Sequence, residues 1–253
     1  MKIMSRSFAL ALLLACCSST FAQTIADGDA AIEKYDIDAA LKAYRAAHAA
    51  DIANYEAAWK LARTLADKGT LENNRSVQAK LYSEAETIAR VAVRLRENDS
   101  KGHTYLAIAV GKRALFEGGQ RKVELSKEVK EEAARAAQLN SREDLAYHVL
   151  GVWNREMVEL NWMLKKFAEL LYGKFPAASL DNATTYLERA AELAPERLAH
   201  HVELGLTYAS ARQWQKADAE LSRAVAMPKS WVTDDYYKRL AKQNLERVKR
   251  HLD

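Results

Sequence analysis

Histidine is the side chain most often used for metal binding and proton transfer near neutral pH, and this chain holds six histidines. None of them lies in an H-E-x-x-H motif or in another metal-ligand spacing. His200 and His201 are adjacent, so on a helix their rings point about 100° apart and do not readily share one ion. We therefore expect no metal site, and we interpret His148 as a histidine that packs between helices with its ring nitrogens satisfied.

Motifs for nucleophilic catalysis and phosphate binding are absent from the sequence as well. It contains no G-x-S-x-G, P-loop or G-x-G-x-x-G pattern. The pair Gly118-Gly119 follows no strand pattern, so it indicates a turn between helices. The carboxylates of residues 121–135 alternate with Lys and Arg, as they do on a solvated helix face. The sequence predicts a protein that is not an enzyme, with no catalytic residues and no cofactor.

The first 22 residues have the composition of an export signal. Two cations precede the apolar run of residues 8–15, which is far shorter than the roughly 20 residues that span a bilayer. The small residues that follow form a cleavage site ending at Ala22. We expect cleavage after Ala22, which leaves one domain, residues 23–253, in the periplasm or outside the cell.

The two cysteines, Cys16 and Cys17, lie within this expected leader. The mature chain would then have no disulfide, no thiolate metal site and no cysteine nucleophile. The alternative is a lipoprotein, because Leu13-Leu14-Ala15-Cys16 resembles a lipobox in which Cys16 is lipidated and anchors the protein to a membrane. No later apolar run reaches membrane length, so we expect no transmembrane segment in the mature chain.

The composition narrows the fold class. Nine Gly and three Pro are too few for an all-β sandwich, which needs a turn every 8–12 residues or so. Hydrophobic residues make up 49% of the chain and charged residues 28%, which is a globular composition. A net charge of +4 does not indicate a nucleic-acid-binding protein.

Two short patterns recur along the chain in the manner of tetratricopeptide repeats. The first is Leu followed by Ala or Gly, and it begins at Leu61, Leu106, Leu150 and Leu204. The second resembles A-x3-F-x2-A. Its five occurrences are Ala40/Tyr44/Ala47, Ala85/Ala89/Ala92, Val129/Ala133/Ala136, Ala183/Leu187/Ala190 and Ala217/Leu221/Ala224. Small residues at these positions allow paired helices to approach closely.

The spacing between the patterns is the strongest evidence for the fold. From the last residue of each second pattern to the next Leu the distance is 14 residues in all four cases, as a 34-residue repeat requires. The distance from each of these Leu residues to the start of the next second pattern has the length typical of such repeats only in the last repeat. The three earlier repeats carry 11, 10 and 20 additional residues between their first and second helix. The sequence thus predicts an all-α, tetratricopeptide-like right-handed α-solenoid of helix pairs, with insertions inside the pairs and a C-terminal capping helix.

The expected helices follow from this register. After a leading helix that ends near Tyr35, we expect them near 37–50, 55–67, 75–97, 101–116, 121–139, 142–172, 178–193, 196–211, 214–227 and 233–251. The last of these is rich in Lys and Arg, as is typical of the polar cap of a solenoid. Contact with anionic lipid headgroups or with an acidic protein is the alternative role for these cations.

The helix expected at 142–172 is the least typical. Apolar residues recur along it at spacings of three and four, and further apolar residues make a second side of the helix apolar. Such a helix either packs in the core or lines an apolar groove for a lipid tail or a partner helix. The candidate contacts for a partner or lipid are Trp153, Met157, Val158, Trp162 and Phe167.

Several segments are more specific than generic repeat positions. They are WKLAR at 59–63, YLAIAVGK at 105–112, YHVLGVW at 147–153, VELNW at 158–162 and LYGKFPAAS at 171–179. With these segments, residues 57–250 resemble the helical-repeat domain of the regulator of microtubule dynamics family. The resemblance implies a non-enzymatic protein. Animal members of the family associate with microtubules, and one tethers organelle membranes and binds phospholipid through its helical-repeat domain.

Two functional hypotheses follow. The first is a non-enzymatic scaffold of the cell envelope that grips a peptide or protein partner in its concave face, as such solenoids do. The second is a phospholipid-binding module that uses the apolar groove around residues 142–172. Peripheral contact with a membrane is compatible with both hypotheses.

Overall fold

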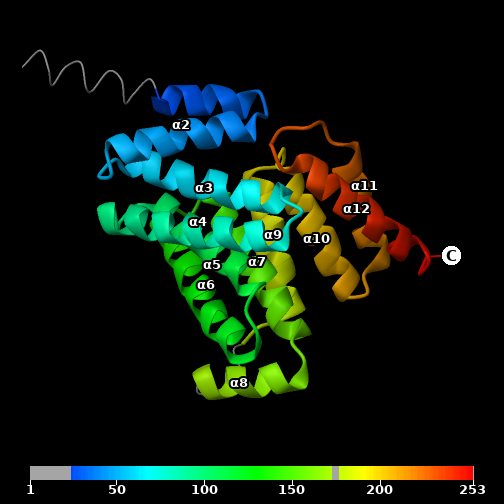
Figure 1. The fold of residues 1–253 in the computed structure, drawn as a ribbon. Helices are drawn as coiled ribbons and strands as arrows, with labels where there is room; N and C mark the ends of the chain where they lie inside the picture. Colours follow the sequence, from blue (N-terminus) through cyan, green and yellow to red (C-terminus); the bar gives the residue numbers. More distant parts are fainter. Residues whose placement is uncertain (1–23, 173–176, 253) are drawn as a thin grey trace, which may run out of the picture.

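The computed structural model describes residues 24–172 and 177–252. The expected leader, its cleavage site at Ala22 and the lipobox Cys16 lie outside these residues. Within them every regular element is a helix (Figure 1). Residues 24–33 form a leading helix. The helices that follow are α2 (Ile37–Ala50), α3 (Tyr55–Leu71), α4 (Arg75–Leu95), α5 (Ser100–Ala114), α6 (Gly119–Leu139), α7 (Asp144–Glu159), α8 (Trp162–Tyr172), α9 (Leu180–Leu193), α10 (Leu198–Ser210), α11 (Trp214–Ala226) and α12 (Asp234–Lys249).

Short polar side chains set where several helices begin. Asp36 accepts a hydrogen bond from the Ala39 amide, Asn54 from the Ala57 amide, and Asn74 from the Ser76 amide. Each bond satisfies one of the backbone N–H groups that the first turn of a helix leaves without a partner. The helix starts expected at residues 37, 55 and 75 therefore agree with the structure.

The helix expected at 142–172 is wrong as a single element. The structure divides it into α7 and α8, with Leu160 in an extended backbone conformation (φ −55°, ψ 139°). The Asn161 side chain then accepts a hydrogen bond from the Leu164 amide at 3.0 Å, which caps the start of α8. Because the chain turns here, α8 runs across the end of the molecule instead of continuing α7 (Figure 1).

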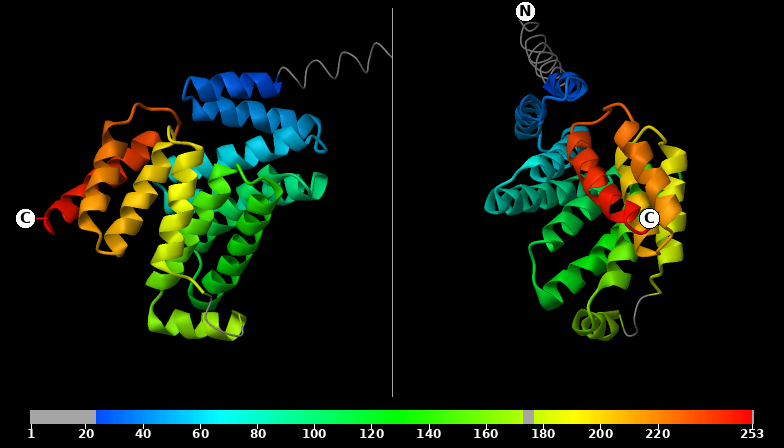
Figure 2. Two further views of the ribbon diagram at one scale, coloured as in Figure 1. Left: turned by 180° about the vertical axis from the view of Figure 1, so that it is seen from behind. Right: turned by 90° about the vertical axis from the view of Figure 1, so that its right-hand side faces the viewer.

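Paired helices touch at the small residues of the recurring patterns, as predicted. An ideal Cβ built at Gly151 would lie 2.5 Å from Leu187 Cγ, and one at Gly205 would lie 2.7 Å from Leu221 Cγ. All members of the second pattern are buried, with relative exposures between 0% and 7%. The pairs stack on one another along the chain (Figure 2), which confirms the all-α tetratricopeptide-like solenoid.

The C-terminal part folds back onto the start of the array. Residues 227–233, which we call the closing loop, join α11 to α12. The Trp231 indole N–H donates to Asp67 Oδ2 on α3 at 3.0 Å, and the Tyr35 hydroxyl donates to the Lys229 carbonyl at 2.9 Å. Val232 is buried in the first core cluster. Within the described ranges, no helix has both the length and the hydropathy that a membrane crossing requires.

Candidate functional site: a cavity on the inner face

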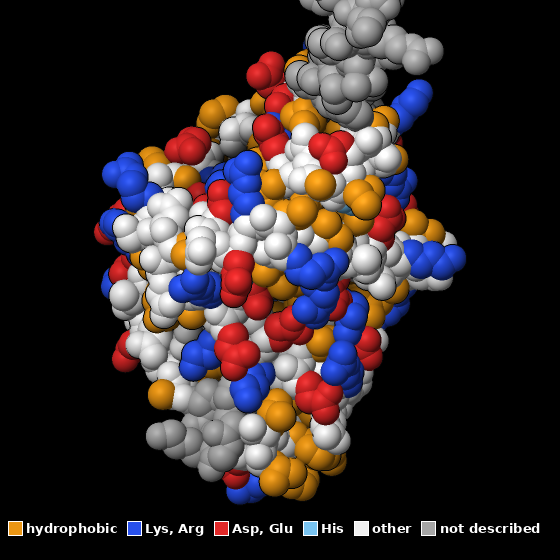
Figure 3. Space-filling view, turned by 90° about the vertical axis from the view of Figure 1, so that its left-hand side faces the viewer, with side chains coloured by type: hydrophobic (Ala, Val, Ile, Leu, Met, Phe, Trp, Pro, Cys, Tyr) orange, Lys and Arg blue, Asp and Glu red, His pale blue; other side chains and the backbone are white. Residues whose placement is uncertain are grey.

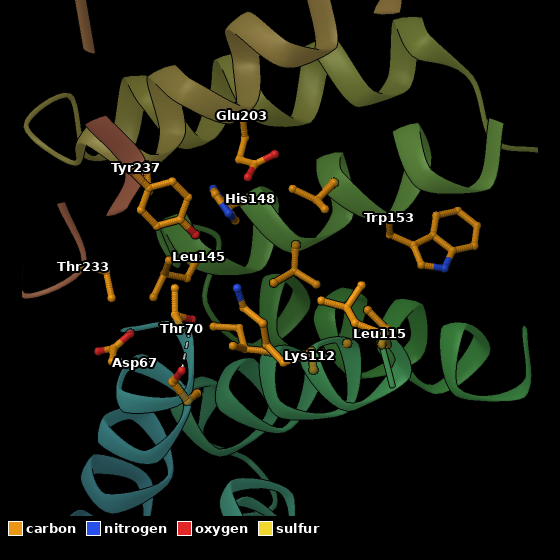
Figure 4. A pocket seen from close by; sticks show the side chains of 18 of the residues that line it. Asp67, Thr70, Lys112, Leu115, Leu145, His148, Trp153, Glu203, Thr233 and Tyr237 are labelled. Carbon is orange, nitrogen blue, oxygen red and sulfur yellow. Dashed lines mark hydrogen bonds between the residues drawn. The ribbon is translucent and has the colours of Figure 1, made fainter. Parts of the chain in front are cut away.

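A cavity of about 430 Å³ lies on the inner face of the array. Its wall comes mainly from the first helix of successive pairs, α3, α5, α7 and α10, and it is covered by the closing loop and α12. Figure 4 shows charged and hydroxyl groups toward one end of this space and Trp153 with Leu115 toward the other. The cavity therefore has two chemically different ends.

The apolar end is built by α5 and α7. Leu115, Val149, Val152 and Trp153 line it. Trp153 is held in place because its indole N–H donates to the Ser126 carbonyl at 2.7 Å, and the Lys130 ammonium lies 4.7 Å from its ring centroid. This end can accept a hydrocarbon segment but offers few polar partners.

The polar end is organised around Trp231. The Arg63 guanidinium lies 5.0 Å from the Trp231 ring centroid and that of Arg197 lies 5.9 Å away, while Asp67 accepts the indole N–H. Burial raises the pKa of the Asp67 carboxyl above its ordinary value of 3.8, against the opposing positive charge of Arg63. The guanidinium groups of Arg63 and Arg197 and the Asp67 carboxyl therefore meet at the Trp231 ring at this end of the cavity.

Lys112 extends from α5 into the middle of the cavity, toward His148 and Glu203 (Figure 4). Among residues 24–172 and 177–252, its ammonium group has no hydrogen-bonding or ion-pair partner. Burial lowers its pKa below the ordinary value of 10.5, and the carboxylates of Glu203 and Asp67 oppose this effect only through space. A partly buried cation that has no partner among the described residues is costly, so the site favours a ligand that brings an anion to Lys112.

Glu203 already forms an ion pair with Arg155. Its Oε2 accepts a hydrogen bond from Arg155 Nη2 at 2.7 Å, and Arg155 Nη1 also donates to the Glu203 carbonyl and the Thr207 hydroxyl. Arg155 and Glu203 are both buried. This pair fixes α7 against α10, whereas Lys112 in the middle of the cavity has no such partner among the described residues.

His148, on the wall next to Lys112, belongs to a buried relay. Its Nδ1 lies 2.9 Å from Nδ1 of His200, whose Nε2 lies 2.9 Å from Asp144 Oδ2. Burial lowers the pKa of both histidines below 6.5, so both rings are neutral at pH 7. With His200 donating to Asp144, His148 must donate to His200, which leaves Nε2 of His148 as a hydrogen-bond acceptor. His148 is thus a packing histidine that also lines the cavity, but among the described residues only Nδ1 has a partner, whereas both ring nitrogens were expected to be satisfied.

Asp144 is held ionised by its partners. Burial alone would raise its pKa, but the hydrogen bond from His200 and the positive charge of Arg197 outweigh burial and hold the pKa below its usual range. Arg197 Nε donates to Asp144 Oδ2 at 2.8 Å. In the part of the chain that the structure describes, no group of three His, Cys, Asp or Glu side chains is arranged to hold a metal ion.

The residues predicted to contact a partner lie in two separate places. Trp153 lines the cavity, Met157 is buried in the core beside it, and Val158 is half-buried. Trp162 and Phe167 lie on α8, outside the cavity, and are 74% and 36% exposed. Because the chain turns between α7 and α8, these five residues do not share one helix face.

Lys112 was not among the residues predicted to contact a ligand. Its signal is a stripe on α5, where Tyr105, Ile108, Lys112 and Leu115 recur at spacings of three, four and three and all line the cavity. One cation inside an otherwise apolar stripe marks a charge that faces inward. The contribution of Trp231 has no local signal, because its partner Asp67 is 164 residues away.

Comparison with known proteins agrees with this architecture. The chain is 27% identical over 175 residues to mouse Regulator of microtubule dynamics protein 1 and 28% identical over 170 residues to Xenopus laevis Regulator of microtubule dynamics protein 3. The alignments cover 68% and 64% of this chain but 57% and 37% of those proteins, so the chain spans about half the length of these curated relatives or less.

Among solved structures, a thermophilic TPR protein of Thermus thermophilus superposes with a TM-score of 0.62 at 17% identity, covering 87% of this chain and 98% of that one. This likeness shows the fold. Residues 24–249 match the family described as Regulator of microtubule dynamics protein 1-3. The chain belongs to that family.

Proposed function

We propose that this chain acts by binding rather than by catalysis, and that it holds an anionic lipid in its inner cavity. The observation that carries the proposal is the unpartnered Lys112 ammonium at the middle of a cavity whose far end is apolar. A phosphate-bearing headgroup would supply the missing anion, and an acyl chain would occupy the end lined by Leu115 and Trp153. A volume of about 430 Å³ is within the range of roughly 300–1,000 Å³ typical of small-molecule pockets.

The test is native mass spectrometry of the chain purified without detergent. We expect adducts with phospholipid masses that disappear on organic extraction. Lys112→Met removes the charge and keeps the length of the side chain, and Val152→Phe narrows the apolar end, so each should reduce lipid occupancy. Lys42→Met, on the exposed side of α2, is the matched control and should retain the adducts. Unchanged occupancy in both cavity variants would refute the proposal.

A short peptide is the second candidate ligand, and one feature of the cavity favours it. Carboxyl groups of Asp67 and Glu203 line the same cavity as Lys112, so the site offers both signs of charge. A peptide terminus could place its carboxylate at Lys112 and an amide N–H at Nε2 of His148. Tandem mass spectrometry of any adduct distinguishes the candidates, because a peptide fragments along its backbone and a lipid releases fatty acids. Crosslinking in envelope extracts then tests for the protein scaffold.

Export to the cell envelope is part of the proposal and rests on the composition of residues 1–22. Fractionation of cells that express the full chain should place it outside the cytoplasm. The mass of the mature protein then separates the two routes. A chain that begins at Gln23 supports cleavage at Ala22, and a chain that begins at a lipidated Cys16 supports the lipoprotein.

A further inference from the structure

The outward face of α8 carries an unusual concentration of apolar side chains. Trp162 is 74% exposed, Leu170 81% and Met163 54%. Phe167 and Leu171 are partly exposed as well, whereas Ala168 on the opposite side is buried in the core. The helix is thus anchored by one side and presents the other side to solvent.

This face differs from the rest of the described surface. Five of the eleven exposed large apolar residues of the described ranges lie on α8, and the other six are distributed over several other elements. Figure 3 shows hydrophobic side chains gathered at the end of the molecule where α8 lies. Single exposed apolar residues are ordinary, but a contiguous group marks an interaction surface.

Positive charge surrounds the apolar face. Lys165 and Lys166 lie on α8 itself, and Arg121 and Lys122 lie in the first turn of α6, which packs against α8. Arg121 pairs with Glu124 at 2.9 Å and Lys166 with Glu169 at 3.0 Å, so Lys122 and Lys165 are the two of these cations without an ion-pair partner among the described residues. The first turn of α6 contains no acidic residue and has no side-chain cap, so the positive end of its dipole adds to the same field. The surface is therefore complementary to an anionic partner.

The size and place of the face indicate which partner. Scaled by the exposures above, the five side chains present on the order of 500 Å² of apolar surface. A stable protein interface buries about 800 Å² on each partner, so this helix alone is small for a dimer. A bilayer needs no such matched surface, because each apolar side chain enters the interfacial layer separately. The helix also lies across the end of the molecule, where Figures 1 and 2 show no other described helix beyond it.

We propose that the α8 face docks on the surface of a lipid bilayer that carries anionic headgroups. Trp162, Met163 and Leu170 enter the boundary between headgroups and acyl chains, and the lysines of α8 contact the headgroups. Trp is suited to this boundary because its ring is apolar and its indole N–H is polar. The proposal does not rest on the ligand of the inner cavity, whose lining shares only Lys122 with this surface.

The experiment is flotation of the full chain with vesicles of phosphatidylcholine, alone or mixed with phosphatidylglycerol. We expect the chain to float with the mixed vesicles and much less with the neutral ones. Trp162→Glu and Leu170→Glu should each weaken binding by roughly tenfold, because each removes one large inserted side chain. The double variant Lys165→Gln with Lys166→Gln should lower affinity for the mixed vesicles by roughly tenfold and leave neutral vesicles unaffected.

Ile52→Glu is the matched control. Ile52 is 71% exposed, as prominent as Trp162, but it lies in the turn between α2 and α3. Its substitution should leave vesicle binding unchanged. Circular dichroism checks that all variants remain helical, which their exposed positions favour.

Two outcomes overturn the inference. Equal flotation of wild-type chain, Trp162→Glu and Leu170→Glu would show that α8 does not meet the bilayer. A wild-type chain that fails to float but forms a dimer, with Trp162→Glu monomeric in light scattering, would assign the face to a second copy. The lipid adducts of the cavity are measured separately, so Trp162→Glu can lose flotation while keeping its adducts.

Discussion

Gly151 is the position where one methyl group should disturb the packing of α7 against α9 most directly. An added Cβ would lie 2.5 Å from Leu187 Cγ and 3.0 Å from the Ala183 carbonyl oxygen. Carbon atoms in contact normally lie about 3.5–4.0 Å apart, so the overlap with Leu187 is about 1 Å. The obstacle is the branch point of a fully buried side chain together with the backbone, and neither can move aside cheaply. The two helices would have to separate.

Overpacking a core usually costs about 1–3 kcal/mol, and the overlap at Gly151 belongs to the upper part of that range because both obstacles are fixed. Ala is favoured over Gly inside a helix by roughly 1 kcal/mol, so we expect Gly151→Ala to lower the free energy of unfolding by about 1–2 kcal/mol. Gly151→Leu should cost roughly 3 kcal/mol or more, because the larger side chain also meets α9. Urea unfolding followed by circular dichroism measures both values.

Gly111 is the matched control, because it also lies inside a first helix of its pair. An added Cβ there would lie 3.6 Å from Val129 Cγ2, an ordinary contact, so Gly111→Ala should stabilise the chain by about 0.5–1 kcal/mol. Combining Gly151→Ala with Leu187→Ala should cost less than the sum of the single changes, because the second change removes the obstacle. If Gly151→Ala proves as stable as the wild-type chain, the assigned register of α7 against α9 is refuted.

Two further predictions concern the closing loop and the histidines. Trp231→Ala removes the hydrogen bond from the indole N–H to Asp67 and should lower the free energy of unfolding by roughly 2–3 kcal/mol. An unchanged melting temperature would contradict a role for the closing loop in holding the two ends of the array together. Burial depresses the pKa of His148, so below pH 6.5 the unfolded chain takes up a proton that the folded chain does not, and the free energy of unfolding falls on acidification. His148→Gln should make this fall smaller, as measured by urea unfolding at several pH values between about 5 and 8. The hydrogen bond to Glu132 raises the pKa of His103, whose stabilisation is complete below pH 6.5 and is lost as the pH rises through its folded pKa, so His103→Gln should make the loss on acidification steeper.

Local sequence signals were sufficient for most of the fold. Asn54 and Asp99 cap helices whose starts could be predicted, because a capping side chain acts on backbone groups only two or three residues away. The contact between Gly151 and Leu187 followed from matching two patterns, since helix pairs in such repeats approach at fixed positions. The predicted register of the first helix against the second helix of each pair was correct because one residue type dominates each position of the two patterns.

The break between α7 and α8 could not be predicted from periodicity. Apolar residues continue at helical spacing through Leu160 and Leu164, so the stripe gives no sign that the chain turns. Asn161 is the local signal, because its side chain can cap a new helix, but the direction of α8 depends on the surface that α6 offers. Trp162 was consequently grouped with Trp153, although the structure places one outside and the other in the cavity.

The closing loop has a consequence for how the chain unfolds. In an open repeat array each unit touches only its neighbours, so the two ends fray independently and folding can spread from any point. Here the bond between Trp231 and Asp67 joins positions 164 residues apart, and Val232 completes the first core cluster. A contact of such long range must be closed against chain entropy, which slows folding. The same contact couples the two ends of the array, so removal of the last helix should destabilise the first helix pair, and the whole array should unfold in one cooperative transition.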